Sequence, residues 1–337
     1  MEKKKTWLWV LIGLIVVALV GVGVFFFLNK DSKKDSKKED TKKEEKVEDK
    51  EKATPLLYKV TKDGSDTEIY LFGSIHLADD RAYPMRDEIL NAYNKSDNLA
   101  VEFDIVEYAK NTQQQMEDAK LLIYTDGTQI SDHLSKESYD TIMQYIKNNN
   151  AYNSVYEMYK PVLFFTLMEQ IQAVKSGLQQ DKGIDLYFLN KAHEENKNII
   201  DIESSSFQYG FLSGFSDRFY EYLILSSIVG EEESVNGLKN LYESWLKGDT
   251  EGIESSNSDE IDDSAKFLDK DLLEEAKRFN EGFIYERNEN MAKAVDGFYK
   301  EGKNTFVVVG VAHIVGDRGV AKLLEKEGYK VELVEYK

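Results

Sequence analysis

The chain has 337 residues, a formal net charge of −19 and no cysteine. This length suits one large domain or two small ones, and 42% hydrophobic residues are enough to build a sizeable core. The lack of cysteine excludes disulfides, thiolate metal ligands and cysteine nucleophiles. The strongly acidic balance excludes a nucleic-acid partner bound through a basic patch.

The first predicted element is an uncharged apolar run over residues 7–28, WLWVLIGLIVVALVGVGVFFFL. Its 22 residues are long enough to cross a bilayer as a helix and too long for the core of a typical cleaved signal peptide. We therefore expect residues 1–6 to form a cytoplasmic tail and residues 7–28 to form a single-pass anchor in the cell membrane.

The orientation of this anchor follows from its flanks. More lysines follow the run than precede it, which by itself favours a cytoplasmic domain. Those lysines alternate with acidic residues, however, and an N-terminal anchor usually exports the chain behind it, so we expect the domain to be extracytoplasmic. Residues 29–54 are almost wholly Lys, Glu, Asp, Ser and Thr, a composition typical of a disordered, charged linker.

The remaining residues, 55–337, are predicted to form one α/β domain. It begins with a hairpin signal, in which apolar segments flank an Asp63-Gly64 turn. The segments expected to be strands cover residues 56–61, 68–72, 98–103, 198–203, 305–309 and 330–335. Helical patterns separate them, and this alternation indicates a mixed sheet covered on both faces by helices. The long stretches 106–180 and 207–300 are expected to form a large helical elaboration packed on that sheet.

Two of the four histidines, His76 and His313, lie in Gly-x-x-His motifs that directly follow apolar strands. Open α/β sheets bind ligands beyond the carboxyl ends of their strands, and a glycine there permits a sharp exit from the strand. We therefore predict that the two motifs build one site, with Gly73 and Gly310 shaping it. The alternative is two buried histidines that only pack at strand ends. The other two histidines are expected to be surface or supporting residues.

Carboxylates follow two of the predicted strands. Glu102 and Asp104 end one of them, and Asp201 and Glu203 end another. A carboxylate in a near-continuous apolar segment is costly unless it is paired, protonated or bound to a metal. Glu102 is therefore a candidate functional residue, and Asp104 is expected on the same face of the strand because side chains alternate.

An arginine interrupts the apolar side of a predicted helix over residues 272–298. Arg287 falls between Phe283 and Met291 on that side, so it should face inward. A buried arginine needs an anionic partner. Two roles stay open: a structural pair with Glu203 or Asp185, or a clamp that stabilises an oxyanion or carboxylate of a substrate.

Taken together, these pieces resemble the TraB/PrgY/GumN family, which is related to the membrane-anchored Tiki proteases. Their order and spacing cover the domain from about residue 56 to its end. The matching pieces are Gly73-Ser74-Ile75-His76, Glu102, Gly183-Ile184-Asp185, Glu203 with Gln208, Arg287-Asn288 with Met291, and Gly310-x-x-His313 with Gly316 and Gly319.

The resemblance implies an erythromycin-esterase/ChaN-like α/β fold and, for Tiki-type members, metal-dependent proteolysis. It points to His76, Glu102 and His313 as essential residues. Other members of the family act on or sequester peptides. Residues expected to support the site or touch the substrate are Gly73, Ser74, Asp104, Asp185, Gln208 and Gly310.

Our first hypothesis is a metal-dependent hydrolase, a peptidase for a peptide or protein substrate. His76, Glu102 and His313 would hold a divalent ion such as Mn, Co or Zn. Glu203 or Asp104 would act as a base or orient a histidine, and Arg287 would stabilise the oxyanion.

Two alternatives remain. The first is a metal-independent, esterase-like hydrolase in which a histidine activates water. The second is a protein that binds a peptide or haem without turnover. The sequence leaves the substrate and the oligomeric state open.

Overall fold

The computed structural model describes residues 52–256 and 268–337. The predicted tail and anchor, and nearly all of the predicted linker, lie outside these residues. Within the described ranges, no helix is both long and apolar enough to span a membrane. What the structure describes is thus the predicted α/β domain.

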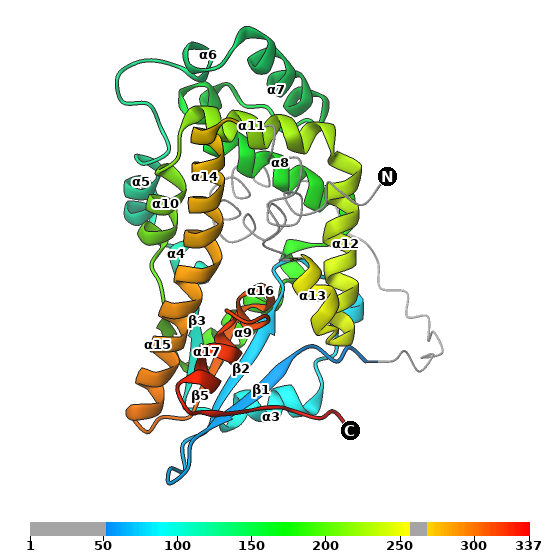
Figure 1. The fold of residues 1–337 in the computed structure, drawn as a ribbon, viewed down its shortest axis with the longest axis vertical. Helices are drawn as coiled ribbons and strands as arrows, with labels where there is room; N and C mark the ends of the chain where they lie inside the picture. The colour runs from blue at the N-terminus through cyan, green and yellow to red at the C-terminus, as the bar shows by residue number, and fades with distance from the viewer. Residues whose placement is uncertain (1–51, 257–267) are drawn as a thin grey trace.

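Six strands form one mixed sheet in the order β4-β3-β5-β2-β1-β6. The four strands β4, β3, β5 and β2 are parallel, and β1 pairs antiparallel with both β2 and β6. The expected mixed α/β sheet is confirmed (Figure 1). The strands are β1 (Leu57–Thr61), β2 (Ile69–Ser74), β3 (Asn98–Val101), β4 (Asn198–Asp201), β5 (Thr305–Gly310) and β6 (Lys330–Leu333).

The hairpin and the central strands follow directly from their sequences. Gly64 adopts a positive φ of 82° between β1 and β2, a conformation that glycine accepts without strain. Every residue of β2, β3 and β5 is buried, as expected for central strands with helices on both faces. β3 ends at Val101 and β4 at Asp201, so both strands are shorter than the sequence predicts.

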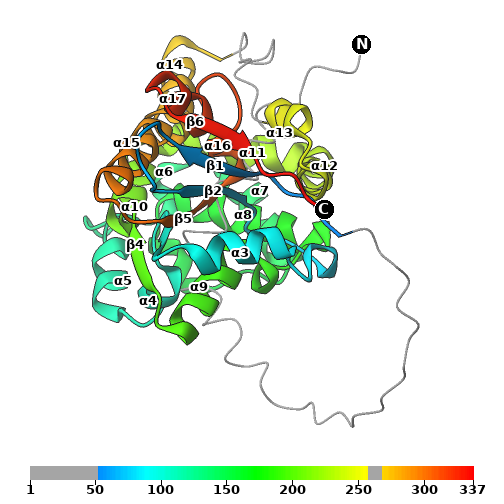
Figure 2. The same cartoon turned by 90° about the horizontal axis from the view of Figure 1, so that it is seen from below.

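Helices cover both faces of the sheet, as Figure 2 shows from below. Side chains of α3, α9 and α12 pack on one face, and side chains of α15 and α17 pack on the other. The covering helices are α3 (Asp87–Lys95), α9 (Ile184–Glu195), α12 (Glu231–Lys247), α15 (Glu286–Lys300) and α17 (Val320–Lys326). We call the apolar cluster on the first face the α3/α9 core; it includes Leu77, Val101 and Leu178.

The remaining helices build a layer above the carboxyl edge of the parallel strands (Figure 1). Its own apolar cluster, the helical-layer core, joins α7, α8, α11 and α14 and includes Leu167 and Phe103, the residue after Glu102. The main helices of this layer are α5 (Thr112–Ala119), α7 (Lys136–Asn148), α8 (Pro161–Ser176), α10 (Ser205–Ser213), α11 (Asp217–Val229) and α14 (Lys270–Asn280).

Shorter elements complete the connections. They are η1 (Asp80–Ala82), α4 (Ile105–Tyr108), α6 (Ile130–His133), η2 (Ser154–Met158), η3 (Gln180–Lys182), α13 (Thr250–Ser256), η5 (Glu281–Tyr285) and α16 (Val311–Ile314). The segment η5 is π-helical and joins α14 to α15, so the continuous helix predicted over residues 272–298 is interrupted there. Such π segments occur often at functional sites, and this one ends two residues before Arg287.

Candidate active site

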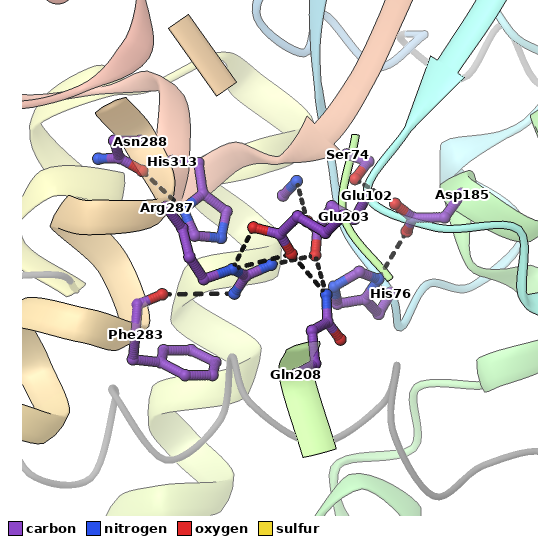
Figure 3. A network of polar contacts seen from close by, with 11 residues as sticks. Ser74, His76, Glu102, Asp185, Glu203, Gln208, Phe283, Arg287, Asn288 and His313 are labelled. Atoms are coloured by element: carbon purple, nitrogen blue, oxygen red, sulfur yellow. Dashed lines mark hydrogen bonds and ion pairs between the residues drawn. The ribbon is translucent and has the colours of Figure 1, made fainter. Parts of the chain in front are cut away.

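The two Gly-x-x-His motifs lie at the ends of neighbouring strands. β2 and β5 pair in parallel with Ser74 opposite Gly310, so both strands deliver the residues behind them to the same edge of the sheet. Figure 3 shows His76 and His313 on either side of Glu102, which follows β3. The structure thus brings together residues that lie far apart in the sequence.

The two motif glycines have different surroundings, and close packing requires glycine only at Gly73. A Cβ built on Gly310 would lie 3.4 Å from Glu102 Oε1, 3.5 Å from His313 Cδ2 and 4.0 Å from His76 Nε2. A side chain at this position would therefore fill the space that the three groups share. A Cβ on Gly73 would lie only 2.7 Å from Val311 Cγ2, so glycine lets α16 pack against β2.

A carboxylate holds the first imidazole. His76 Nδ1 lies 2.7 Å from Asp185 Oδ2, and the other oxygen of Asp185 accepts a hydrogen bond of 2.5 Å from Ser74 Oγ. Burial opposes a positive charge on His76, but the Asp185 carboxylate outweighs it and, with Glu102, raises the pKa of His76 to about 9. In the absence of a bound cation, His76 is therefore an imidazolium at neutral pH.

An amide holds the second imidazole. His313 Nδ1 lies 2.7 Å from Asn288 Oδ1, and Asn288 Nδ2 donates to the Arg318 carbonyl at 2.9 Å. The Arg318 carbonyl fixes which way the amide faces, so His313 Nδ1 must donate and Nε2 keeps its lone pair. Burial and the nearby Arg287 cation lower the pKa of His313 to about 3, so this imidazole is neutral.

A buried ion-pair cluster lies between the two histidines. Arg287 Nη2 donates to Glu102 Oε2 at 2.6 Å, and Arg287 Nε donates to Glu203 Oε1 at 2.8 Å. Gln208 Nε2 donates to Glu203 Oε2 at 2.8 Å, and the Gly310 N–H donates to Glu102 Oε1 at 3.0 Å. Both carboxylates therefore have partners on more than one side, as burial requires.

These partners determine the charge of Glu102. Burial alone would raise its pKa, but Arg287, both imidazoles and the Gly310 N–H together hold it well below its usual range. Glu102 is thus an anion, although its side chain is only 10% exposed.

Arg287 is held by protein groups on several sides. Its third nitrogen, Nη1, donates to the Phe283 carbonyl in the π segment at 3.3 Å, so all three guanidinium nitrogens are engaged by the protein. Of the two roles that the sequence leaves open, the arrangement matches the pair with Glu203, extended to Glu102. Asp185, the other partner considered for Arg287, binds His76 instead.

Asp104 lies apart from this cluster. Its Oδ1 accepts hydrogen bonds from two N–H groups of α4, and its Oδ2 lies 2.7 Å from His193 Nε2. The expectation that Asp104 shares a face with Glu102 is wrong because β3 ends at Val101 and the strand alternation does not continue. Asp201 also turns to this group, accepting a hydrogen bond from the Asp104 N–H at 2.8 Å.

Asn288 supports His313, a role that the sequence did not predict although the family resemblance includes this residue. It is 1% exposed and makes the only hydrogen bond described to His313 Nδ1 in residues 52–256 and 268–337. A neutral amide gives no warning in a sequence, because burying it carries no charge to be compensated. The available signal was its place in the Arg287-Asn288 piece of the family resemblance.

The imidazole nitrogens and the Glu102 carboxylate are the kinds of atoms that bind divalent ions. Each imidazole is held through Nδ1, which is how histidine ligands of metals are typically oriented, and Nε2 of each is left for the site. With a Glu102 oxygen, they offer two nitrogens and one carboxylate, which suits Mn, Co or Zn. In the described part of the chain, however, no group of three or more His, Asp or Glu side chains is already positioned to hold a metal ion. Arg287 engages one oxygen of Glu102, so that contact would have to adjust.

The same residues also offer acid–base chemistry. The neutral His313 presents a lone pair at Nε2, while the charged His76 presents a proton at Nε2. Two titratable groups whose surroundings push their pKa values apart are the usual basis for a base and an acid in one site.

A family model describes a long stretch of this chain. The model, described as the TraB/PrgY/gumN family, matches residues 56–333. The whole site, from Gly73 to His313, lies within the matched range. Neither a curated protein nor a solved structure matches the chain.

Proposed function

Because the chain belongs to the TraB/PrgY/gumN family, we propose that it is a hydrolase that cleaves a peptide or protein substrate. His76, Glu102 and His313 would form its active site. One observation carries this proposal: two imidazoles and a carboxylate share a single space, and each imidazole is held through Nδ1 by a residue that does not enter that space.

We further propose that His76, His313 and Glu102 bind a divalent ion, either Mn, Co or Zn. A bound ion of this kind polarises a carbonyl and lowers the pKa of water. Asp185 and Asn288 would keep the imidazoles in position, and Arg287 would hold Glu102 ionised and bind Glu203. Glu203 would act on the reaction only through Arg287 and Gln208, because those residues occupy its oxygens.

A metal-independent hydrolase is the second candidate, and the opposite protonation of the two histidines favours it. In this route, His313 Nε2 would take a proton from the attacking water, and His76 Nε2 would give one to the leaving nitrogen. Glu102 would stabilise the His313 imidazolium formed during the reaction.

Purified full-length protein tests both routes. Cleavage of a quenched peptide library would be measured with and without EDTA and with added Mn, and the metal content would be determined in parallel. Stoichiometric metal that is lost in His76→Ala, together with loss of cleavage in EDTA, would support the metal route. Full activity in metal-free protein would reject that route and support the second.

Catalysis itself is tested by His76→Ala and His313→Ala. Loss of a general acid or base typically costs about 10²–10⁴-fold in rate, so either variant should lose nearly all cleavage while remaining folded. If the wild-type protein binds peptides or haem but cleaves no peptide under any condition, it is a binding protein without turnover.

We also propose that residues 7–28 anchor the chain in the membrane with the domain outside the cytoplasm. The support is the sequence itself: the uncharged run is long enough to span a bilayer. Protease added to intact cells should remove the domain if it is outside, and cell fractionation should place the full chain with the membranes. Protection of the domain in intact cells would reverse the orientation.

A further inference from the structure

A mostly apolar pocket of about 560 Å³ has Leu77, the residue after His76, in its wall. Its walls include Leu77, Leu167, Ile171 and Leu178, and Val174 lies at its mouth with 78% of its surface exposed. A concave pocket of this size with apolar walls is typical of a ligand site. Neither metal binding nor the acid–base chemistry described above uses it.

The pocket wall and the first catalytic histidine belong to the same piece of backbone. Leu77 directly follows His76, and Ala78 exchanges two hydrogen bonds with Gln179, which also lines the pocket. A Cβ on Gly183 would lie 2.4 Å from the His76 carbonyl oxygen and 3.0 Å from the Gln180 carbonyl oxygen. The segment that lines the pocket is therefore packed directly on the backbone of His76.

The distance from the site to the pocket suits an extended chain. Consecutive Cα atoms are about 3.8 Å apart and an imidazole reaches a few ångströms further, so the wall at Leu77 begins within about 10 Å of His76 Nε2. An extended peptide advances about 3.3 Å per residue, so about three residues cover this distance.

The pocket and the site also lie at the same boundary between two layers. Leu77 and Leu178 belong to the α3/α9 core, whereas Leu167 belongs to the helical-layer core. Glu102 lies at this boundary too, because Val101 belongs to the first cluster and Phe103 to the second.

Exposed amide side chains at the mouth, those of Asn150 and Gln179, favour a peptide over a purely apolar ligand. An amide group both donates and accepts hydrogen bonds, as a peptide backbone does. A fatty chain could not form such hydrogen bonds, and water would stay bound to these groups.

We propose that this pocket binds a hydrophobic side chain of the peptide substrate, two or three residues from the bond that is cleaved. This inference rests on the proposed function and names the substrate class: peptides with an apolar residue at one fixed distance from the cleavage site.

The test compares two exposed valines in the full-length protein. Val174→Trp places an indole at the pocket mouth, and Val229→Trp is the matched control because Val229 is 81% exposed at the end of α11 and does not line the pocket. The probes are quenched Gly-Ser hexapeptides in which a single Leu is moved from the first to the sixth position.

Wild-type protein should cleave peptides with Leu at one or two adjacent positions about tenfold faster, in kcat/KM, than the Leu-free peptide. Val174→Trp should lower the rate on the preferred peptide to that on the Leu-free peptide, and Val229→Trp should keep the preference. Cleavage without any positional preference, or a preference that Val174→Trp retains, would overturn the pocket inference and leave the proposed function intact.

A binding measurement distinguishes failure of the pocket inference from failure of the proposed hydrolase function. In the His76→Ala/His313→Ala variant, a fluorescein-labelled hexapeptide with the preferred Leu should bind about tenfold more tightly than its Leu-free counterpart. If no peptide is cleaved by wild-type protein, the same comparison is made with each Leu peptide. Selective binding that Val174→Trp abolishes would then support the pocket inference even though the hydrolase proposal has failed. Equal binding of all peptides would reject the pocket inference.

Discussion

The pKa values of two buried carboxyl groups in this molecule are shifted in opposite directions. Glu102, in the candidate site, and Glu169, on α8 in the helical layer, are 8% and 4% exposed. Arg287 and both imidazoles surround Glu102 and hold its pKa well below the usual range. Neither oxygen of Glu169 has a hydrogen-bond partner within the described residues, and burial raises its pKa well above the usual range.

The comparison shows what burial alone decides and what it does not. Both groups lose contact with water to a similar extent, so the cost of burying a charge is similar for both. The guanidinium at 2.6 Å offsets this cost for Glu102, whereas Glu169 avoids it by keeping its proton. Of these two buried carboxyl groups, the one that stays ionised is therefore the one with a cation beside it.

Removing that cation should have the largest effect. Arg287→Met leaves Glu102 and Glu203 buried without their counter-charge, and breaking a buried pair in this way typically costs about 3–5 kcal/mol. Urea unfolding at pH 7 measures the loss, and peptide cleavage should disappear. In the triple variant with Glu102→Gln and Glu203→Gln, stability should largely return while cleavage stays absent. An Arg287→Met protein within about 1 kcal/mol of wild type would mean that the cluster does not control stability.

Replacing the buried acid Glu169 on α8 should have the next largest effect, and it should raise the free energy of unfolding rather than lower it. Glu169→Met keeps the size of the side chain and removes the buried acid, so it should stabilise the fold by about 2 kcal/mol at pH 8. Because the folded-state pKa of Glu169 is raised, wild-type stability falls as pH rises above the unfolded-state pKa. The gain in Glu169→Met should therefore be smaller at pH 4 than at pH 8. A gain that is equal at both pH values would contradict a protonated Glu169.

Asn288→Asp tests whether a carboxylate beside His313 raises the pKa of this histidine, as Asp185 does for His76. A carboxylate beside His313 Nδ1 would resemble the Asp185–His76 pair and raise the pKa of His313. His313 would then be protonated at pH 6, so kcat/KM should fall about tenfold or more at this pH while staying near wild type at pH 9. The control is Asn288→Ala, which leaves Nδ1 without its partner and should reduce activity at every pH. Parallel pH profiles for Asn288→Asp and wild type would show that Asn288 does not control His313.

A surface ion pair gives the smallest expected effect. Arg318 and Glu281 form a pair in which the side chains are 43% and 47% exposed. Glu281→Gln should change the free energy of unfolding by less than about 0.5 kcal/mol, and salt should remove even that difference. A change as large as that of Arg287→Met would show that exposure to water is not what separates weak pairs from strong ones here.

The convergence of the site could be predicted because it depends on rules of sheet geometry. His76 and His313 follow apolar strands, and the carboxyl ends of parallel strands meet at one edge. The inward position of Arg287 followed from helical spacing, and its need for an anionic partner followed from the cost of a buried charge. The resemblance to the TraB/PrgY/GumN family is likewise confirmed by the family match over residues 56–333.

The partners within the site could not be predicted in the same way. Nothing in the sequence indicates that Asp185 binds His76 rather than Arg287, since both pairings satisfy the same charges. Asp104 turned away because β3 stops at Val101, and strand ends are set by the tertiary fold rather than by local pattern. The π segment Glu281–Tyr285 was also hidden, because it changes backbone hydrogen bonds without disturbing the apolar side of the helix.

The order of the strands has a consequence for how the protein is made. β5 is inserted between β2 and β3, yet it is the fifth strand to leave the ribosome. Until residue 305 has emerged, the flanking strands expose unpaired edges and cannot close into one sheet. A chain released before residue 305 therefore has a divided sheet and lacks His313, so it cannot form the candidate site.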